Sequence, residues 1–226
     1  KSIGVDGDFA PVLDVPAPGS DKIVGDRAFS DDPEVVAMLA RAALKGLHAG
    51  AVTGCIKHMP GHGRATADSH FALPRVSASA AELETDIAPF AALKRAEAAM
   101  TAHIVFEAWD SARPATCSAR LIEELIRGRI GFSGLLMSDD LDMHALKPIG
   151  DLRARAEAAL RAGCEVVLQC SGKLKEMMAT ASGCRELAGT ALERARAVER
   201  LAHRPAEDFD PAAGWARFKA LTSALS

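Results

Sequence analysis

The chain contains no tyrosine, only two tryptophans, and 4% aromatic residues among its 226 residues. Large exposed rings are the side chains on which flat ligand surfaces stack. A sequence this poor in them is not expected to build an extended platform for a long polysaccharide. If the protein binds a carbohydrate, a short ligand fits the composition better.

An excess of positive charge is also lacking, since the net charge is -3 and the basic residues are scattered among acidic ones. Nucleic-acid binding usually shows as a concentrated basic face, so we expect no nucleic-acid partner. No apolar run approaches the roughly 20 residues that cross a bilayer, and the N-terminus has no charged leader followed by an apolar core. We expect a soluble protein without a membrane partner.

Paired cysteines are a third absence. The five cysteines are an odd number, and none forms a Cys-x-x-Cys pair. Cys164 and Cys170 bracket one predicted strand and would lie about 20 Å apart at the usual strand rise. We therefore predict buried, reduced thiols, which are typical of a cytoplasmic protein.

Short β-branched runs alternate with longer alanine-rich amphipathic segments, which is the pattern of βα units around a parallel sheet. The predicted strands span residues 5–15, 52–58, 99–106, 134–138 and 165–169. The predicted helices span residues 33–49, 79–98 with a break or kink at Pro89, 118–129, 152–162 and 185–202. Residues 205–226 are expected to form a surface tail or a short terminal helix. The sequence thus predicts an α/β fold with one domain over residues 1–226.

Polar side chains gather where the predicted strands end. Asp14, Lys57 with His58, and Asp139 with Asp140 each come at the end of an apolar run, and His103 lies within the third run. In parallel α/β folds the loops at the carboxyl ends of the strands build the active site. We therefore expect these groups to meet at one end of the sheet.

Asp139 is the candidate nucleophile, because a carboxylate at a strand end can attack an electrophilic carbon such as the anomeric centre of a sugar. The alternative is that Asp139 and Asp140 only cap the next segment or bind a cation, a role that suits Asp140 better. His70 follows Asp68 by two residues, so the carboxylate could orient the imidazole for proton transfer near neutral pH. His70 could equally be a solvated or structural loop residue.

The glycine-containing loop has two other interpretations. His58, His62 and His70 could assemble a metal site, but Lys57 beside His58 would repel a divalent cation, so no metal or other cofactor is expected. Gly61 and Gly63 could cradle a phosphate, but the segment lacks the Gly-Lys-Ser/Thr ending of a P-loop. We expect these glycines to let a long loop fold back over a pocket.

Two motifs resemble a known family. Residues 57–70 read Lys-His-Met-Pro-Gly-His-Gly-Arg-Ala-Thr-Ala-Asp-Ser-His, and residues 138–143 read Ser-Asp-Asp-Leu-Asp-Met. Together they resemble the bacterial β-N-acetylglucosaminidases of glycoside hydrolase family 3. Residues 5–15 resemble the third barrel strand of that family, residues 25–33 its arginine-bearing loop, and residues 162–168 its seventh strand, so the resemblance spans residues 1 to about 200.

The resemblance implies a (β/α)8 TIM-type barrel and a retaining glycosidase that releases terminal β-linked N-acetylglucosamine. It makes Asp139 the nucleophile, with His70 the general acid/base and Asp68 its partner. It assigns Arg27, Lys57 and His58 to the sugar hydroxyls. The implied substrate is N-acetylglucosamine linked to anhydromuramic acid that carries a peptide, cleaved in cytoplasmic peptidoglycan recycling. The oligomeric state is left open.

One departure from the family is large, because its first two strands and an Asp-Gln-Glu-Gly-Gly segment have no counterpart here. A barrel without these strands cannot close, so we expect them to precede residue 1 in the natural protein. Three alternatives stay open: another family 3 glycosidase or phosphorylase such as a β-glucosidase, a metal-dependent hydrolase, and a non-catalytic sugar-binding descendant.

Overall fold

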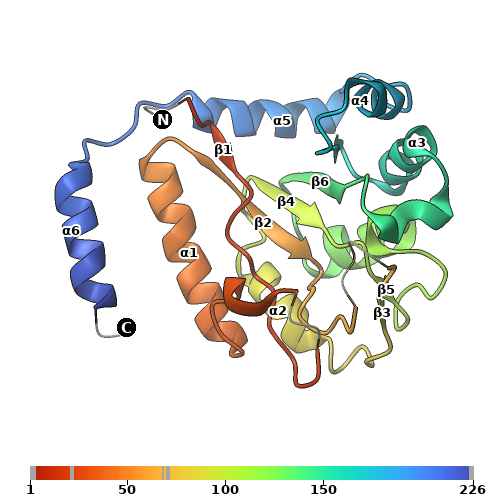
Figure 1. Ribbon diagram of the computed structural model, residues 1–226, viewed down its shortest axis with the longest axis horizontal. Coiled ribbons are helices and arrows are strands. Elements are labelled where there is room, and N and C mark those ends of the chain that lie inside the picture. The colour runs from red at the N-terminus through yellow and green to blue at the C-terminus, as the bar shows by residue number, and fades with distance from the viewer. Residues whose placement is uncertain (1–3, 21–22, 68, 70–71, 224–226) are drawn as a thin grey trace.

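A parallel sheet of five strands forms the centre of the computed structural model, which describes residues 4–20, 23–67, 69 and 72–223 (Figure 1). The strand order is β1-β2-β4-β6-β7, with every neighbour parallel. Each new strand is therefore added on the same side of the previous one, as in a barrel wall rather than a doubly wound sheet. The strands are β1 (Gly7–Asp8), β2 (Thr53–Met59), β4 (Ala98–Thr101), β6 (Leu135–Asp140) and β7 (Val166–Leu168).

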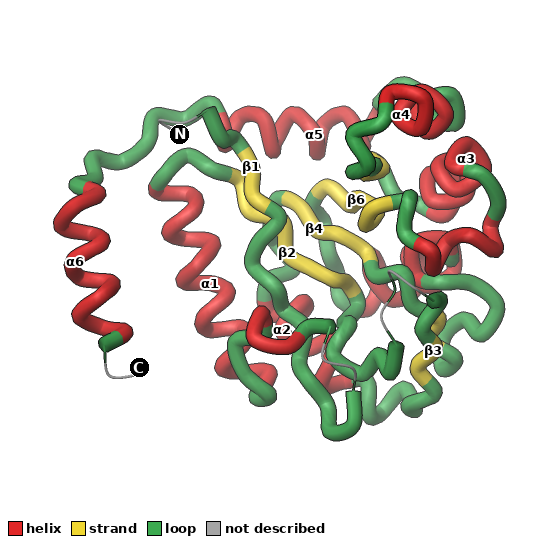
Figure 2. The backbone as a smooth tube through the Cα atoms, viewed as in Figure 1, coloured by secondary structure: helices red, strands yellow, loops and turns green. Residues whose placement is uncertain are grey.

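Helices alternate with these strands along the chain (Figure 2). The α-helices are α1 (Pro33–Ala49), α2 (Glu84–Ala92), α3 (Leu152–Ala162), α4 (Leu174–Ala181), α5 (Gly189–Ala202) and α6 (Pro211–Thr222). Four shorter or irregular helices are η1 (Gly25–Arg27), η2 (Ala115–Cys117), the π-helix η3 (Leu121–Arg129) and η4 (His144–Ile149). A separate pair of short strands joins β3 (Arg75–Val76) to β5 (Val105–Phe106).

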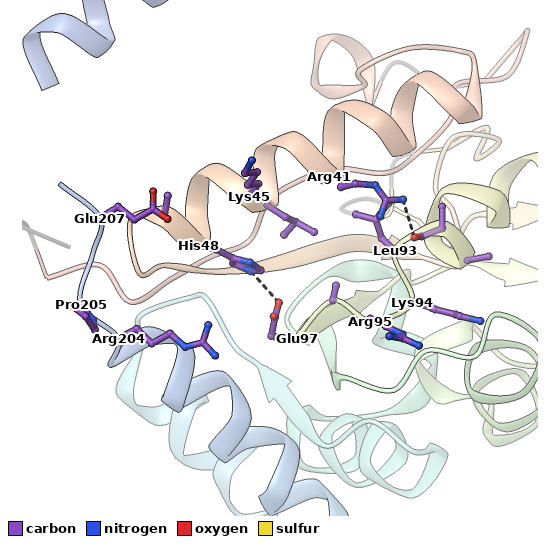
Figure 3. Close-up of a pocket in the computed structure, with 15 residues that line it drawn as sticks. Arg41, Lys45, His48, Leu93, Lys94, Arg95, Glu97, Arg204, Pro205 and Glu207 are labelled. Carbon is purple, nitrogen blue, oxygen red and sulfur yellow. Dashed lines mark hydrogen bonds and ion pairs between the residues drawn. The ribbon is translucent and has the colours of Figure 1, made fainter. Parts of the chain in front are cut away.

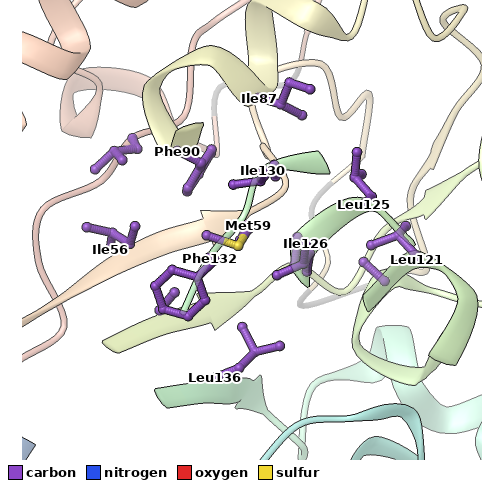
Figure 4. Packing of buried hydrophobic residues seen from close by; sticks show 14 of the residues in the cluster. Ile56, Met59, Ile87, Phe90, Leu121, Leu125, Ile126, Ile130, Phe132 and Leu136 are labelled. Carbon is purple, nitrogen blue, oxygen red and sulfur yellow. The ribbon is translucent and has the colours of Figure 1, made fainter. Parts of the chain in front are cut away.

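The main core lies between one face of the sheet and the helices around it (Figure 4). Ile56 of β2 and Leu136 of β6 are fully buried there, beside Phe90 of α2 and Ile126 of η3. The other face of the sheet carries a smaller cluster, in which Cys55, Ala98, Met100 and Leu135 pack against Ala195 and Val198 of α5. Both faces are thus covered, and the second face is covered by a helix instead of by the far wall of a closed barrel.

The structure confirms the α/β fold with a parallel sheet. Over the described residues this sheet forms a curled half-barrel rather than a closed barrel. Helix α1 has the predicted ends, because Asp32 accepts a hydrogen bond from Glu34 N, Pro33 opens the helix, and Gly50 follows its end. The prediction for residues 79–98 was too long. Ser79 and Glu82 do form the expected capping box, but the α-helix begins at Glu84 and runs through Pro89 without breaking there.

Three strand and helix predictions need correction. The predicted strand over residues 5–15 is interrupted. It pairs with β2 at Gly7–Asp8 and at an isolated bridge between Val12 and Lys57, and Ala10 O and Leu13 N also form backbone hydrogen bonds with β2. Pro11 between them has no backbone N–H to donate. The run over residues 99–106 divides into β4 and β5. Helix α4 was not predicted, since no side chain caps its start.

The thiol prediction is confirmed in part. All five cysteines are free, and Cys55, Cys117 and Cys164 are buried as expected, whereas Cys170 and Cys184 are exposed. None of the helices in the described part of the chain is both long and apolar enough to cross a bilayer.

Candidate functional site

The carboxyl end of β6 presents two adjacent carboxylates in different roles. Oδ1 of Asp139 accepts a hydrogen bond from the backbone N of Asp140 at 2.8 Å, and the Asp139 side chain is 19% exposed. Oδ1 of Asp140 accepts from the backbone N of Asp142 and of Cys170, both at 3.1 Å. Asp140 therefore links the loops after β6 and β7, while Asp139 Oδ2 faces a side chain from another strand of the sheet.

That neighbour is His58, near the end of β2. Its Nε2 lies 4.0 Å from Asp139 Oδ2, and its Nδ1 lies 2.7 Å from Asp14 Oδ2. His58 is 7% exposed and Asp14 is fully buried. The prediction that polar groups from separate strands meet at one end of the sheet holds for Asp14, His58 and Asp139, which form a carboxylate–imidazole–carboxylate row.

Asp14 also anchors the loop that follows β2. Its Oδ1 accepts hydrogen bonds from the backbone N of His58 at 3.0 Å and of His62 at 2.7 Å. Burial raises the pKa of Asp14, but the adjacent imidazoles of His58 and His62 and the hydrogen bonds from His58 lower it by more, so the net shift is downward. Asp14 is therefore an ionised carboxylate that only accepts hydrogen bonds.

His62 lies behind His58 in the same loop. The two rings meet edge to face with centroids 5.6 Å apart, and Nε2 of His62 lies 3.3 Å from the hydroxyl of Ser69. Burial lowers the pKa of His62, and the nearby Asp14 carboxylate offsets this only in part. A neutral His62 thus connects the start of the loop to Ser69, whose backbone O also accepts from Ala145 N.

His103, which the sequence placed within an apolar run without assigning it a role, lies beneath the end of β6. Its Nε2 donates to the backbone O of Asp140 at 3.0 Å, and its Nδ1 lies 2.7 Å from the hydroxyl of Thr116. Burial lowers the pKa of His103 despite the nearby Asp139 carboxylate, so the ring is neutral. The signal that could have identified it is a polar residue placed directly after the β4 segment.

The remaining predicted site residues are less closely grouped. Lys57 is half-buried in β2, and Leu13 N donates to its backbone O at 2.7 Å. Arg27 is exposed in η1, where its guanidinium donates to the backbone O of Ile23. Asp68 and His70 lie outside the described residues. No group of three or more His, Cys, Asp or Glu within the described ranges could hold a metal ion, but the alternative metal set includes His70.

The loop after β2 packs too closely against the β1 segment to accept a side chain at Gly63. A Cβ there would lie 1.8 Å from the backbone O of Val15. We expect Gly63→Ala to lower the free energy of unfolding by about 3 kcal/mol, the upper part of the usual range for overpacking, and chemical denaturation would measure it. Gly46→Ala is the matched control, because no atom lies within 4 Å of its Cβ position and alanine favours a helix. A Gly63 variant as stable as the Gly46 variant would contradict this packing.

A cavity of about 610 Å³ lies at the other end of the sheet (Figure 3). Its walls come from the end of α1, the segment before β4 and the segment after α5, and they include Arg41, Lys45, His48, Glu97 and Arg204. His48 and Glu97 form an ion pair of 3.1 Å within it. Because Glu97 directly precedes β4, this cavity is separate from the carboxyl ends of the strands, where Asp139 and His58 meet.

Comparison with known proteins gives a consistent result. A β-hexosaminidase of Bordetella avium is 44% identical over 174 residues, which cover 76% of this chain and 49% of the relative. Among solved structures, a glycoside hydrolase family 3 β-N-acetylglucosaminidase from Paenibacillus superposes with a TM-score of 0.81 at 29% identity, covering 93% of this chain and 43% of that one. NagZ from Neisseria gonorrhoeae, in complex with N-trifluoroacetyl-D-glucosamine, gives a TM-score of 0.75 at 35% identity, covering 89% and 61%.

The chain spans about half the length of the curated relatives that it matches. Residues 1–203 match the glycosyl hydrolase family 3 N terminal domain, and the chain therefore belongs to this family.

Proposed function

We propose that the protein is a retaining β-N-acetylhexosaminidase in which Asp139 is the nucleophile. One observation carries this proposal: Asp139 is a partly exposed carboxylate at the carboxyl end of β6, with Oδ2 turned toward the imidazole of His58 near the end of β2. Parallel α/β folds carry out their chemistry at this end of the strands. The names of the relatives, β-hexosaminidase and β-N-acetylglucosaminidase, support the same substrate class.

The reaction has two steps. In the first, Asp139 Oδ2 bonds to the anomeric carbon while His70, oriented by Asp68, gives a proton to the departing oxygen. In the second, His70 takes a proton from water, the water oxygen bonds to the anomeric carbon, and the bond to Asp139 breaks. Two displacements at one carbon retain its configuration. Arg27 and Lys57 have donors that suit the hydroxyl oxygens of the sugar, and His58 is placed to contact a sugar hydroxyl beside the nucleophile.

The proposed substrate is a short muropeptide in which N-acetylglucosamine is linked to anhydromuramic acid, released in cytoplasmic peptidoglycan recycling. The absence of tyrosine and the low aromatic content support a short substrate over a long chain. Within the described part of the chain, the neighbours of the nucleophile include the polar His58 and the backbone N–H of Asp140. We propose that the closed barrel of the family completes this site.

Trapping the glycosyl-enzyme tests the proposal. Incubation with a 2-acetamido-2-deoxy-5-fluoro glycosyl fluoride is expected to add one sugar residue to the protein, because the fluorine slows the second step more than the first. Peptide mapping by mass spectrometry should then place the sugar on Asp139. A label on any other side chain would assign the nucleophile elsewhere, and complete absence of labelling and of aryl N-acetylglucosaminide cleavage would refute the function.

The same assay separates the alternative activities. Parallel reactions with β-glucosides, with and without inorganic phosphate, distinguish a hydrolase from a β-glucosidase or phosphorylase. A phosphorylase would release the sugar 1-phosphate only when phosphate is present. Activity lost to a chelator and restored by a divalent cation would instead favour the metal-dependent alternative with His58, His62 and His70.

A further inference from the structure

Asp14 uses its two carboxylate oxygens for different purposes. Oδ1 accepts hydrogen bonds from two backbone amides, His58 N and His62 N, which hold the end of β2 and the loop after it against the segment that follows β1. Oδ2 lies against the imidazole, with His58 Nδ1 at 2.7 Å. Oδ1 of Asp14 therefore has a structural role, and Oδ2 acts on one side chain of the site.

The contact at Oδ2 decides where the proton of the imidazole lies. A buried carboxylate without a proton can only accept a hydrogen bond, so Nδ1 of His58 must carry the hydrogen. In the neutral ring the other nitrogen, Nε2, then has a lone pair, and it is Nε2 that faces Asp139 Oδ2 across 4.0 Å. The edge-to-face contact with His62 fixes the plane of the ring.

We propose that Asp14 is a positioning residue that fixes the Nδ1–H tautomer of His58 and so presents the lone pair of Nε2, rather than an N–H, to the Asp139 carboxylate. This inference rests on the proposed function, in which Asp139 is the nucleophile.

The tautomer matters to the nucleophile for a simple reason. An N–H at Nε2 of a neutral ring would point its hydrogen at Asp139 Oδ2, 4.0 Å from Nε2, and this positive end of the bond dipole would hold the electron pair of that oxygen back from the anomeric carbon. A lone pair at Nε2 leaves that electron pair free. The lone pair of Nε2 can then accept the hydrogen of a hydroxyl group on a bound molecule.

The Asp14→Asn substitution separates the role of Oδ1 from that of Oδ2. The amide oxygen can replace Oδ1, because only an acceptor satisfies the two backbone N–H groups, so the loop keeps its anchor. The amide nitrogen then replaces Oδ2 and donates to His58 Nδ1. The neutral ring is forced into the Nε2–H tautomer. A purely structural Asp14 would be little affected by this substitution.

The chain also contains a matched control. Asp110 Oδ1 accepts the backbone N of Ala112 and of Arg113, while Oδ2 accepts a side-chain donor, the hydroxyl of Ser118. Asp110→Asn makes the same chemical change in the same hydrogen-bond pattern. The hydroxyl of Ser118 can rotate to accept from the new amide, and the ring of His58 is not involved.

Two measurements test the proposal. Multiple-bond 1H–15N spectra of the histidine rings should show His58 as the Nδ1–H tautomer in the wild type and in Asp110→Asn, and as Nε2–H in Asp14→Asn. On an aryl β-N-acetylglucosaminide, Asp14→Asn should lower kcat by at least about 100-fold with a smaller change in KM; in the serine protease triad, the same Asp-to-Asn change beside a histidine gives the wrong tautomer and costs about 10,000-fold in kcat. Far-UV circular dichroism should confirm that both variants fold.

The NMR spectra and the kinetic assay test different parts of the proposal. An Nε2–H tautomer in the wild type, or an unchanged tautomer in Asp14→Asn, would overturn the assignment whatever the enzyme does. A reversed tautomer with kcat within about 3-fold of the Asp110 variant would show that the tautomer does not act on the nucleophile, which also overturns it. A wild type that shows the expected spectra but no cleavage of the substrate would refute the proposed function and leave the tautomer assignment supported.

Discussion

Asp139→Ala is expected to lower kcat on an aryl β-N-acetylglucosaminide by about 10,000-fold or more, the size of the loss when an enzyme nucleophile is removed. The side chain supplies the only bond that the proposed first step forms with the protein. Its Oδ1 has one hydrogen bond, from the backbone N of Asp140, so its removal should leave the fold intact. Sodium azide should restore part of the turnover, because it can enter the space left by the carboxylate and yield the α-glycosyl azide.

Asp140→Asn is the control for this experiment. The two carboxylates are adjacent in β6, but Asp140 acts through Oδ1, which accepts from two backbone amides and which asparagine retains. We expect its kcat to stay within about 10-fold of the wild type. If Asp140→Asn were the inactive variant and Asp139→Ala retained turnover, the roles of the two carboxylates would have to be exchanged.

The sequence predicted the position of the site better than its internal contacts. Asp139 and His58 could be placed together because each lies at the end of an apolar run, and the ends of parallel strands meet at one edge. The role of Asp14 could not be predicted in this way. It depends on a turn after β2 that brings the backbone N of His62 within 2.7 Å of a residue 48 positions earlier, and no local pattern encodes that approach.

In the fold, too, features set by local sequence signals were predicted, whereas features set by contacts between distant residues were not. Helix α1 was predicted to its last residue because its cap, its first proline and its terminal glycine are all local signals. The packing of α5 across the second face of the sheet was not predicted. It rests on contacts such as the hydrogen bond from Thr53 Oγ1 to the backbone O of Val198, 145 positions apart. Tertiary packing of this kind leaves only an amphipathic pattern in the sequence.

His70→Gly is expected to affect the two steps of the reaction unequally. With a substrate whose leaving group needs a proton, the first step should slow by about 100- to 10,000-fold, the usual contribution of a general acid. With an activated leaving group such as 2,4-dinitrophenolate, the first step should proceed and the second should limit turnover, because water then lacks its general base. A burst of phenolate equal to the enzyme concentration would reveal the accumulated intermediate.

The product formed with azide distinguishes the His70→Gly variant from the Asp139→Ala variant. An anion that needs no general base should accelerate the second step in His70→Gly and yield the β-glycosyl azide, whereas Asp139→Ala should yield the α anomer. His144→Gly is the control, because His144 is an exposed histidine at the start of η4 and its loss should leave both steps unchanged. If His70→Gly showed neither a burst nor rescue, the proton transfer would belong to another group, and the neutral, buried His62 beside Ser69 would be the next residue to replace.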